Sequence, residues 1–265
     1  MNTDDIIYKY RSWNDEKHRR ALEENQFYFS SPADINDPFD CRVSPDLLLL
    51  DTQQKKTQFI EDMISDAKRI LNDRKINHTE LAKKLLHRLE VDINKMQEEY
   101  DEIHSRYTND RFGVISFSFR WNSILLWSHY ANNHTGFCVG LDRKAIEDSD
   151  FFDSAGPMHY QDEYPKVDPL NFISVESALS KTHTKAKDWK YEREYRLLKL
   201  WVDSTPTVED RKVKIPDGYF SEVILGKNIS LEDQEQILKV SSPKKIPVYK
   251  IKVKPRTFIL ERIKL

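Results

Sequence analysis

The sequence predicts an α+β fold over residues 1–265, a single domain with a mixed or antiparallel sheet and an inserted α-helical hairpin at 45–110. Three observations predict this class. Short alternating segments typical of strands lie on both sides of the insertion, and helical periodicity dominates within it. Elsewhere strands and helices follow one another irregularly, without the βαβ rhythm of a doubly wound sheet.

The segment before the insertion contains two predicted strands and one helix. Residues 6–11 alternate as a strand does, residues 15–25 predict a helix, and residues 27–29 predict a second strand. Residues 36–40, Asn-Asp-Pro-Phe-Asp, predict a turn, because Asn and Asp side chains bond to their own backbone and Pro38 restricts φ. This turn leads into the insertion.

The insertion carries two apolar stripes with helical spacing. The first stripe runs through residues 59–71, and a longer one runs through residues 81–107. The outer faces carry charges of both signs, which favours a solvated surface; an arm that binds a partner is the alternative.

Strands dominate after the insertion. They are predicted at 114–119, 136–141, 193–202, 211–215 and 220–225, and two more lie between 248 and 263, separated at Pro255. Helices are predicted at 123–131, 171–181 and 230–240.

Composition excludes several classes of protein. Lys and Arg number 42 against 44 Asp and Glu, so the net charge of -2 gives no overall attraction to nucleic acid. The start lacks the basic and apolar segments of a signal peptide, and no window approaches the roughly 18 apolar residues of a membrane span. Cys41 and Cys138 lie far apart and are expected to be small buried side chains in a reduced, cytoplasmic protein; a disulfide between them is the alternative.

The most informative segment is residues 189–196, Trp-Lys-Tyr-Glu-Arg-Glu-Tyr-Arg. Glu192 and Glu194 lie two apart where a strand is expected to begin, so both side chains and that of Arg196 point to one face. Two carboxylates this close repel each other unless a cation or a hydrogen-bonding group lies between them. A solvated face with salt bridges to neighbouring basic residues is the competing interpretation.

Familiar cofactor and metal signatures are missing. The six glycines form no phosphate-binding loop, and zinc-type pairs of Cys and His are absent. His129 and His134 lie five apart, and packing or hydrogen bonding is favoured for them over metal ligation. No metal site is predicted.

Three strands carry residues that together suit a charged dinucleotide. Arg11 would contact phosphate or ribose hydroxyls, and Ser116 or Ser118 would position the ribose. Glu192 or Glu194 would stabilise an oxocarbenium cation, because a carboxylate is most effective where positive charge develops. The alternative for each residue taken alone is structural: Arg11 would form a salt bridge, and Ser116 and Ser118 would be ordinary polar residues of a strand.

The chain resembles the bacterial family catalogued as domain of unknown function 2971. The pieces that carry the resemblance are Tyr8-Lys9-Tyr10-Arg11, Phe29-Ser30-Ser31-Pro32, residues 36–40, Ile115-Ser116-Phe117-Ser118, Leu126 to Ala131 with His134-x-Gly136-Phe137, and Trp189-x-x-Glu192-x-Glu194-x-Arg196. Together they bracket most of the chain outside the insertion.

A second resemblance is to the ADP-ribosyltransferase fold of the arginine–serine–glutamate type, whose core is a split sheet. Arg11, Ser116-Phe117-Ser118 and Glu192-Arg193-Glu194 follow the order of that type, although Phe117 replaces its usual Thr. The resemblance implies NAD as the substrate and Glu194 as the main catalytic residue. The full set of candidates comprises the catalytic residues Glu194, Glu192 and Ser118, and the NAD-binding residues Arg11, Tyr10, Ser116, Ser30, His129 and Tyr130.

The leading hypothesis is therefore an NAD-dependent ADP-ribosyltransferase or NAD glycohydrolase in a bacterial toxin or phage-defence setting. RNA, DNA or protein would be the acceptor and an antitoxin would be a further partner, whereas no membrane partner is expected. One alternative is a nucleic-acid-acting effector without NAD chemistry, which would use the basic runs at 181–196 and 244–256. The other is a non-catalytic module whose helical hairpin binds a partner.

Overall fold

The computed structural model describes residues 5–71, 78–171 and 181–265, which divide into two compact units. The first unit comprises residues 1–36, 110–162 and 185–265, and the second comprises residues 37–109 and 163–184. The second unit therefore starts earlier than the predicted insertion and also includes a segment from later in the chain. Part of it, together with most of the helix predicted at 171–181, lies outside the described residues.

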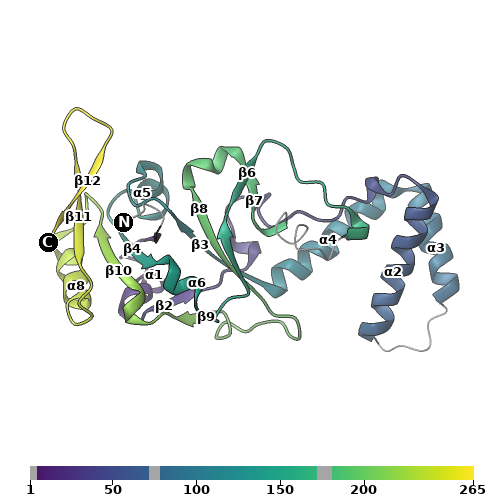
Figure 1. The fold of residues 1–265 in the computed structure, drawn as a ribbon, viewed down its shortest axis with the longest axis horizontal. Helices are drawn as coiled ribbons and strands as arrows, with labels where there is room; N and C mark the ends of the chain where they lie inside the picture. Colours follow the sequence, from purple (N-terminus) through teal and green to yellow (C-terminus); the bar gives the residue numbers. More distant parts are fainter. Residues whose placement is uncertain (1–4, 72–77, 172–180) are drawn as a thin grey trace. The chain divides into compact units, whose positions relative to one another are not determined.

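The described strands confirm the prediction of an α+β chain with a mixed sheet (Figure 1). In chain order they are β1 (Ile6–Arg11), β2 (Gln26–Tyr28), β3 (Phe112–Ser118), β4 (Phe137–Asp142), β5 (Ser154–Pro157), β6 (His159–Gln161), β7 (Thr184–Ala186), β8 (Glu194–Leu200), β9 (Lys212–Lys214), β10 (Phe220–Leu225), β11 (Val248–Val253) and β12 (Leu260–Lys264). Eight of them form one sheet in the order β12-β11-β10-β4-β1-β3-β8-β5. Only the β10–β11 pair in this sheet is parallel.

The pairing across the middle of this sheet is uneven. β1 pairs with β4 over six residues and β3 pairs with β8 over seven, whereas β1 and β3 share the single pair Tyr8↔Ser118. The two strands separate beyond this pair. The Lys9 ammonium fills part of the separation and donates to the Ser116 carbonyl oxygen at 2.6 Å.

Alternation along the strands produces two buried cores in the first unit. Ile7, Phe117 and Tyr195 point to one face, which is covered by α1 (Glu16–Glu23), α6 (Arg143–Glu147) and α8 (Leu231–Ser241). Tyr8 and Tyr10 point to the other face, which α5 (Ile124–Tyr130) covers with fully buried Trp127. The apolar area removed from water on each face stabilises the sheet.

The helices of this unit begin where the sequence supplies capping side chains. Asp15, Ser123, Asp142 and Ser230 accept hydrogen bonds from backbone amides in the first turns of α1, α5, α6 and α8. Short 3-10 helices occupy η1 (Pro32–Asp34), η4 (Lys187–Glu192) and η5 (Asp217–Tyr219).

The turn after α5 requires unusual backbone conformations. Asn132, Asn133 and His134 have φ of 47°, 53° and 67°, which asparagine tolerates better than most residues. Gly136 follows where no side chain fits, since a Cβ atom there would lie 2.1 Å from the Arg11 carbonyl oxygen. The chain therefore returns directly into β4.

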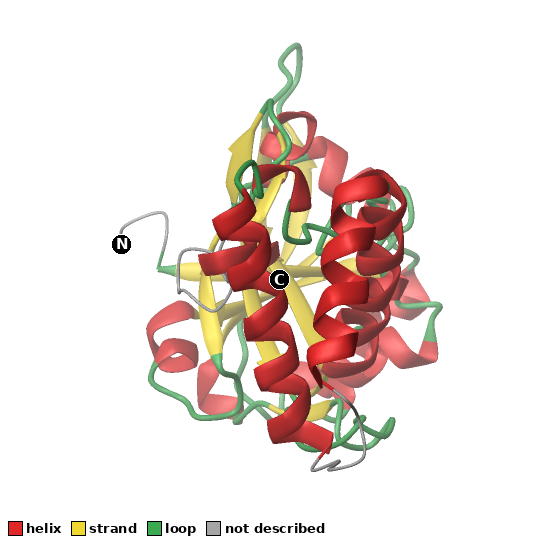
Figure 2. Ribbon diagram, turned by 90° about the vertical axis from the view of Figure 1, so that its right-hand side faces the viewer, coloured by secondary structure: helices red, strands yellow, loops and turns green. Residues whose placement is uncertain are grey.

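The second unit is helical. It contains α2 (Gln53–Leu71), α3 (His78–Val91) and most of α4 (Ile93–Arg111), with the 3-10 helices η2 (Leu47–Leu49) and η3 (Pro169–Asn171); its long red helices lie side by side in Figure 2. The apolar faces of the long helices and the segment around η2 enclose one core. Its buried residues are Leu47, Leu50, Phe59, Ile60, Ile64, Leu89 and Met96.

The long second stripe of the predicted hairpin is divided between two helices. α3 ends at Val91 and α4 begins at Ile93, and the Asp92 carboxylate between them accepts a hydrogen bond from the Lys95 amide at 3.1 Å. An aspartate that caps a new helix start competes with continuation of the old one, so the predicted hairpin has three helices.

Candidate functional site

Glu192 and Glu194 do not lie on one strand as the sequence predicts. Glu192 is the last residue of η4, and β8 begins at Glu194. Arg193 between them adopts a left-handed conformation, with φ 42° and ψ 53°. The two carboxylates nevertheless meet, because the turn at Arg193 returns both side chains to the same buried cation.

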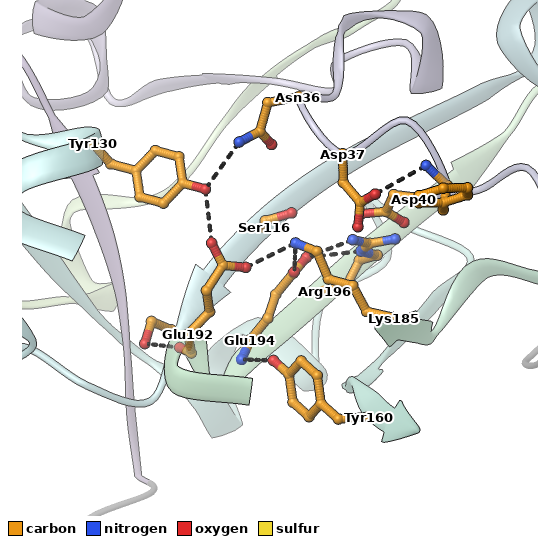
Figure 3. A network of polar contacts seen from close by, with 12 residues as sticks. Asn36, Asp37, Asp40, Ser116, Tyr130, Tyr160, Lys185, Glu192, Glu194 and Arg196 are labelled. Atoms are coloured by element: carbon orange, nitrogen blue, oxygen red, sulfur yellow. Dashed lines mark hydrogen bonds and ion pairs between the residues drawn. The ribbon is translucent and has the colours of Figure 1, made fainter. Parts of the chain in front are cut away.

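That cation is Lys185, at the centre of β7. Its ammonium nitrogen lies 2.8 Å from Glu192 Oε2 and 3.1 Å from Glu194 Oε2 (Figure 3). The exposed fractions of these residues are 6%, 5% and 3%, so they do not form a solvated face. A shared ammonium is the compensation that two neighbouring buried carboxylates require.

Arg196 completes the charge balance on Glu194. Its Nε and Nη2 atoms lie 2.9 Å and 2.8 Å from Glu194 Oε1, and Arg196 is fully buried. Arg196 lies two residues further along β8, so its side chain shares the face of Glu194 as the sequence predicts. Two cations therefore balance two carboxylates within one buried network.

Hydroxyl groups complete this network (Figure 3). Tyr130 donates to Glu192 Oε1 at 2.7 Å, and the Glu194 amide donates to the Tyr160 hydroxyl at 2.8 Å. The Ser116 hydroxyl lies near the Glu194 carboxylate and lowers its pKa, while Ser118 Oγ donates to the Glu192 carbonyl at 2.5 Å. Ser116 thus lies beside a candidate catalytic carboxylate, and Ser118 positions the turn that carries both.

The network holds Glu194 ionised. Burial alone would raise its pKa, but the charges of Arg196 and Lys185, the nearby Ser116 hydroxyl and the hydrogen bond from Arg196 outweigh it. The pKa of Glu194 accordingly falls from 4.5 to about 2. At neutral pH this group acts as a fixed negative charge and has no proton to donate.

Aromatic rings extend from the network toward solvent. The Lys185 ammonium lies 4.7 Å from the Trp189 ring centre, and Trp189 lies 6.2 Å from Tyr191. His129 then lies 6.4 Å from Tyr191 and 6.2 Å from Tyr130. His129 is exposed and the other three rings are half-buried, so this row offers ring faces and edges next to Glu192.

Arg11 lies on the other face of the sheet. It pairs in register with Phe137 and shares the side of Ile7, whereas Ser118 and Glu194 are partners on the opposite face. Its guanidinium donates to the Tyr10 carbonyl at 3.5 Å, and burial lowers its pKa to about 10. The register of β1 against β4 therefore separates Arg11 from the carboxylates.

Two other candidates have structural contacts. Tyr10 is buried, donates to the Arg120 carbonyl at 2.6 Å and packs edge-on against Trp127. Ser30 forms an isolated backbone bridge with Val114 of β3. Neither has a described contact with Glu192 or Glu194.

Sequence reasoning missed Lys185, Tyr160 and Lys9. Lys185 appeared only as a member of a basic run, and nothing in its sequence position distinguished it from the other basic residues of that run. Lys9 stood between two aromatic residues in a predicted strand, where a lysine needs a buried partner. Tyr160 lies in a short strand that carried no signal.

The two basic runs do not form continuous cationic surfaces. In the first, Lys185 and Arg196 are buried in the network and Lys187 pairs with Asp162 at 2.8 Å. In the second, Lys244 donates to the Leu22 carbonyl, and Lys250 donates to Gln234 at 2.9 Å. The exposed remainder of the second run comprises Lys245, which precedes β11, and Lys252, Lys254 and Arg256 on β11 and in the loop that follows it.

Other features of the described residues bear on the remaining expectations. Cys41 and Cys138 are both buried, and no disulfide joins them. Among the residues with described positions, no group of three His, Cys, Asp or Glu side chains could hold a metal ion, and no helix is long and apolar enough to cross a membrane. Phe39, within the segment predicted as a turn at 36–40, is 63% exposed.

Comparison with known proteins identifies one family. Residues 126–197 match the family described as "Protein of unknown function (DUF2971)", which confirms the resemblance inferred from the sequence motifs. The matched range contains Tyr130, Tyr160, Lys185, Glu192, Glu194 and Arg196. No curated protein and no solved structure matches the chain.

Proposed function

We propose that this protein, whose residues 126–197 match the DUF2971 family, cleaves the bond between nicotinamide and ribose in NAD. The reaction would be ADP-ribosyl transfer to a macromolecule or hydrolysis by water. The description of the family assigns no activity, so the proposal depends on the geometry of the site.

The observation that carries the proposal is the register of β3 against β8. It pairs Ser118 with Glu194 and Ser116 with Arg196, so the Ser-x-Ser strand lies beside the Glu-x-Glu segment. This brings together the serine and glutamate parts of the arginine–serine–glutamate type, whereas Arg11 lies on the opposite face of the sheet. The single registered pair between β1 and β3 is also in keeping with a split sheet.

The electrostatics of Glu194 support the chemistry. As nicotinamide departs with the bonding electron pair, positive charge develops on the ribose, and a fixed carboxylate stabilises that charge. Water or an acceptor nucleophile then forms the new bond at the anomeric carbon and releases one proton. Because its pKa is about 2, Glu194 suits the electrostatic role and not that of a proton donor.

Glu192 and the aromatic row support binding of the nicotinamide end. Tyr130 and Lys185 hold the Glu192 carboxylate, and Tyr191 and His129 offer ring faces beside it. A cationic nicotinamide ring is attracted both to aromatic faces and to a nearby carboxylate. Under this proposal Glu192 orients the substrate and Glu194 stabilises the ribosyl cation.

The test is nicotinamide release from NAD by the purified protein and its Glu194→Gln variant, with and without RNA, DNA and cell extract. We expect release to fall by orders of magnitude in the variant, because the charge is lost while the shape is kept. Stimulation by one fraction would identify the acceptor class. In cells, the wild type should deplete NAD and arrest growth, as expected of a toxin or defence effector, whereas Glu194→Gln should not.

Glu222→Gln is the matched control, since Glu222 is also buried in the main sheet and paired with an arginine and a tyrosine. Equal loss in both variants would indicate general destabilisation. No release by folded wild-type protein under any condition would reject the proposal.

The second candidate function is a non-catalytic module in which the network is a structural brace. It is favoured by the engagement of all four carboxylate oxygens and by the low exposure of both glutamates. Under this alternative, Glu194→Gln would reduce stability with no NAD turnover to lose.

A further inference from the structure

The hairpin of β11 and β12 carries an exposed aromatic tip. Phe258 is 96% exposed and Ile259 is 51% exposed in the loop that joins the two strands. In Figure 1 this loop, drawn in yellow, projects away from the rest of the sheet. A single exposed apolar side chain is ordinary on a protein surface, so the groups around Phe258 decide whether it serves as a contact.

Hydrogen bonds within the loop at residues 254–259 hold its backbone in one conformation. The Lys254 amide donates to the Ile259 carbonyl at 3.0 Å, and the Thr257 hydroxyl donates to the Lys254 carbonyl at 3.0 Å. The Ile259 amide donates to Thr257 Oγ1 at 3.2 Å, and Arg256 has a φ of 60°. The loop backbone is thus pre-organised, which lowers the entropy cost of placing Phe258 against a partner.

Cations follow the same hairpin in a line. Lys250, Lys252 and Lys254 alternate along β11 and its extension, so they share one side at intervals of about 6.8 Å. Lys252 and Lys254 are exposed, whereas Lys250 is half-buried and donates to Gln234 at 2.9 Å. Arg256 adds an exposed charge at the tip. The acidic residue on this side is Glu261, which lies opposite Lys252 and pairs with Lys254 at 3.6 Å.

We propose that this hairpin is a contact surface for single-stranded nucleic acid, with Phe258 stacking on a base and the lysine row following the phosphates. An aromatic face combined with a row of cations is the arrangement that binds single strands with little sequence preference. The row leads away from the tip along β11, and the tip offers one fully exposed aromatic ring. A bilayer-inserting loop would instead need its cations at one depth and a larger apolar surface.

This surface is independent of NAD cleavage, and binding is measured without NAD, so the two proposals fail separately. If both hold, nucleic acid is the class of acceptor. The probes are a fluorescein-labelled oligo(dT) and oligo(U) of about 12 nucleotides, a duplex of the same length, and phosphatidylserine vesicles.

We expect binding to both single strands, measured by fluorescence anisotropy, with an affinity that falls as salt rises. Three phosphate contacts predict a log–log slope of about -2. Phe258→Ala should weaken binding about tenfold, Phe258→Trp should preserve it, and Phe258→Leu should weaken it like alanine, because leucine cannot stack. Glu261→Gln should tighten binding by removing the opposing charge.

Controls come from other exposed sites of the same unit. Leu231→Ala removes a 74% exposed side chain from α8, and Lys144→Gln removes an exposed cation from α6; neither should change binding. Absence of oligonucleotide binding at low salt would overturn the proposal, as would binding that Phe258→Ala does not alter. Vesicle binding retained by Phe258→Leu, with no oligonucleotide binding, would assign the hairpin to lipid instead.

Discussion

Two buried carboxylate sites occupy the main sheet, and they solve the same physical problem differently. Glu222 on β10 has no second carboxylate in its described contacts. It accepts a hydrogen bond from the Tyr8 hydroxyl at 2.9 Å and forms an ion pair with Arg262. Glu194 on β8 has Arg196 as its partner but also shares Lys185 with a second carboxylate, Glu192.

The difference lies in the exposure of the cations. The Arg262 side chain is 28% exposed, whereas those of Arg196 and Lys185 are 1% and 4% exposed. Water can therefore screen the Glu222 charge if its partner is lost, but it has little access to the Glu194 network. Burial of a carboxylate is thus no sign of function by itself. Aromatic rings lie near both sites, and a second carboxylate distinguishes the Glu194 site.

Removal of the Lys185 ammonium should show the largest difference in stability between the two carboxylate sites. Lys185→Met leaves two buried carboxylates without their shared cation and should cost about 3–5 kcal/mol of unfolding free energy. Arg262→Met should cost clearly less, because its partner becomes accessible to water. Urea denaturation measures both, and Lys187→Met, at an exposed ion pair, is the control expected to change little. Equal losses for Lys185→Met and Arg262→Met would contradict the distinction.

The Glu194 site should make the stability of the protein depend on pH between about 4.5 and 2. The pKa of Glu194 is about 2 in the folded protein against an ordinary 4.5, so its ionised form contributes stability that is fully present above pH 4.5. That contribution fades as pH falls from 4.5 toward 2. Denaturation midpoints measured across this range should decline more steeply for wild type than for Glu194→Gln. Parallel curves for the two proteins would reject an ionised, stabilising Glu194.

The smallest expected effects come from the two tyrosines that donate to the buried carboxylates. Tyr130→Phe removes the hydrogen bond to Glu192, and Tyr8→Phe removes the one to Glu222. Each should cost about 1.5–3 kcal/mol of unfolding free energy in urea denaturation, the usual range for a hydrogen bond to a charged group. If the Glu192 site binds NAD, Tyr130→Phe should also raise the KM for NAD, whereas Tyr8→Phe should leave it unchanged.

Much of the fold follows from local patterns. The strands at 6–11 and 220–225 are found with their predicted bounds, since alternation and nearby turn residues are local signals. The three-helix arrangement was missed because the apolar stripe continues through Asp92, and the stripe alone does not show that its carboxylate caps a new helix. The division into two units depends on contacts between residues 37–109 and 163–184, which are distant in sequence.

The candidate site was only partly predictable for the same reason. The spacing of Glu192 and Glu194 indicated a carboxylate pair in need of a cation, and Ser116 and Ser118 shared a face because strand alternation is local. Which cation would meet the pair was undetermined, since several basic residues lie nearby in sequence. The left-handed turn at Arg193 and the position of β7 select Lys185.

By itself, the sequence determined the α+β class, the family resemblance and the proximity of the two glutamates, because periodicity, motif and spacing are properties of short segments. Only the tertiary structure decided that Lys185 lies between the glutamates, that the network is buried, and that Arg11 lies on the opposite face of the sheet. Those outcomes depend on strand register and on which distant segments pair. Strand register and the pairing of distant segments are set by the free energy of the whole packed chain, which cannot be read from any short segment.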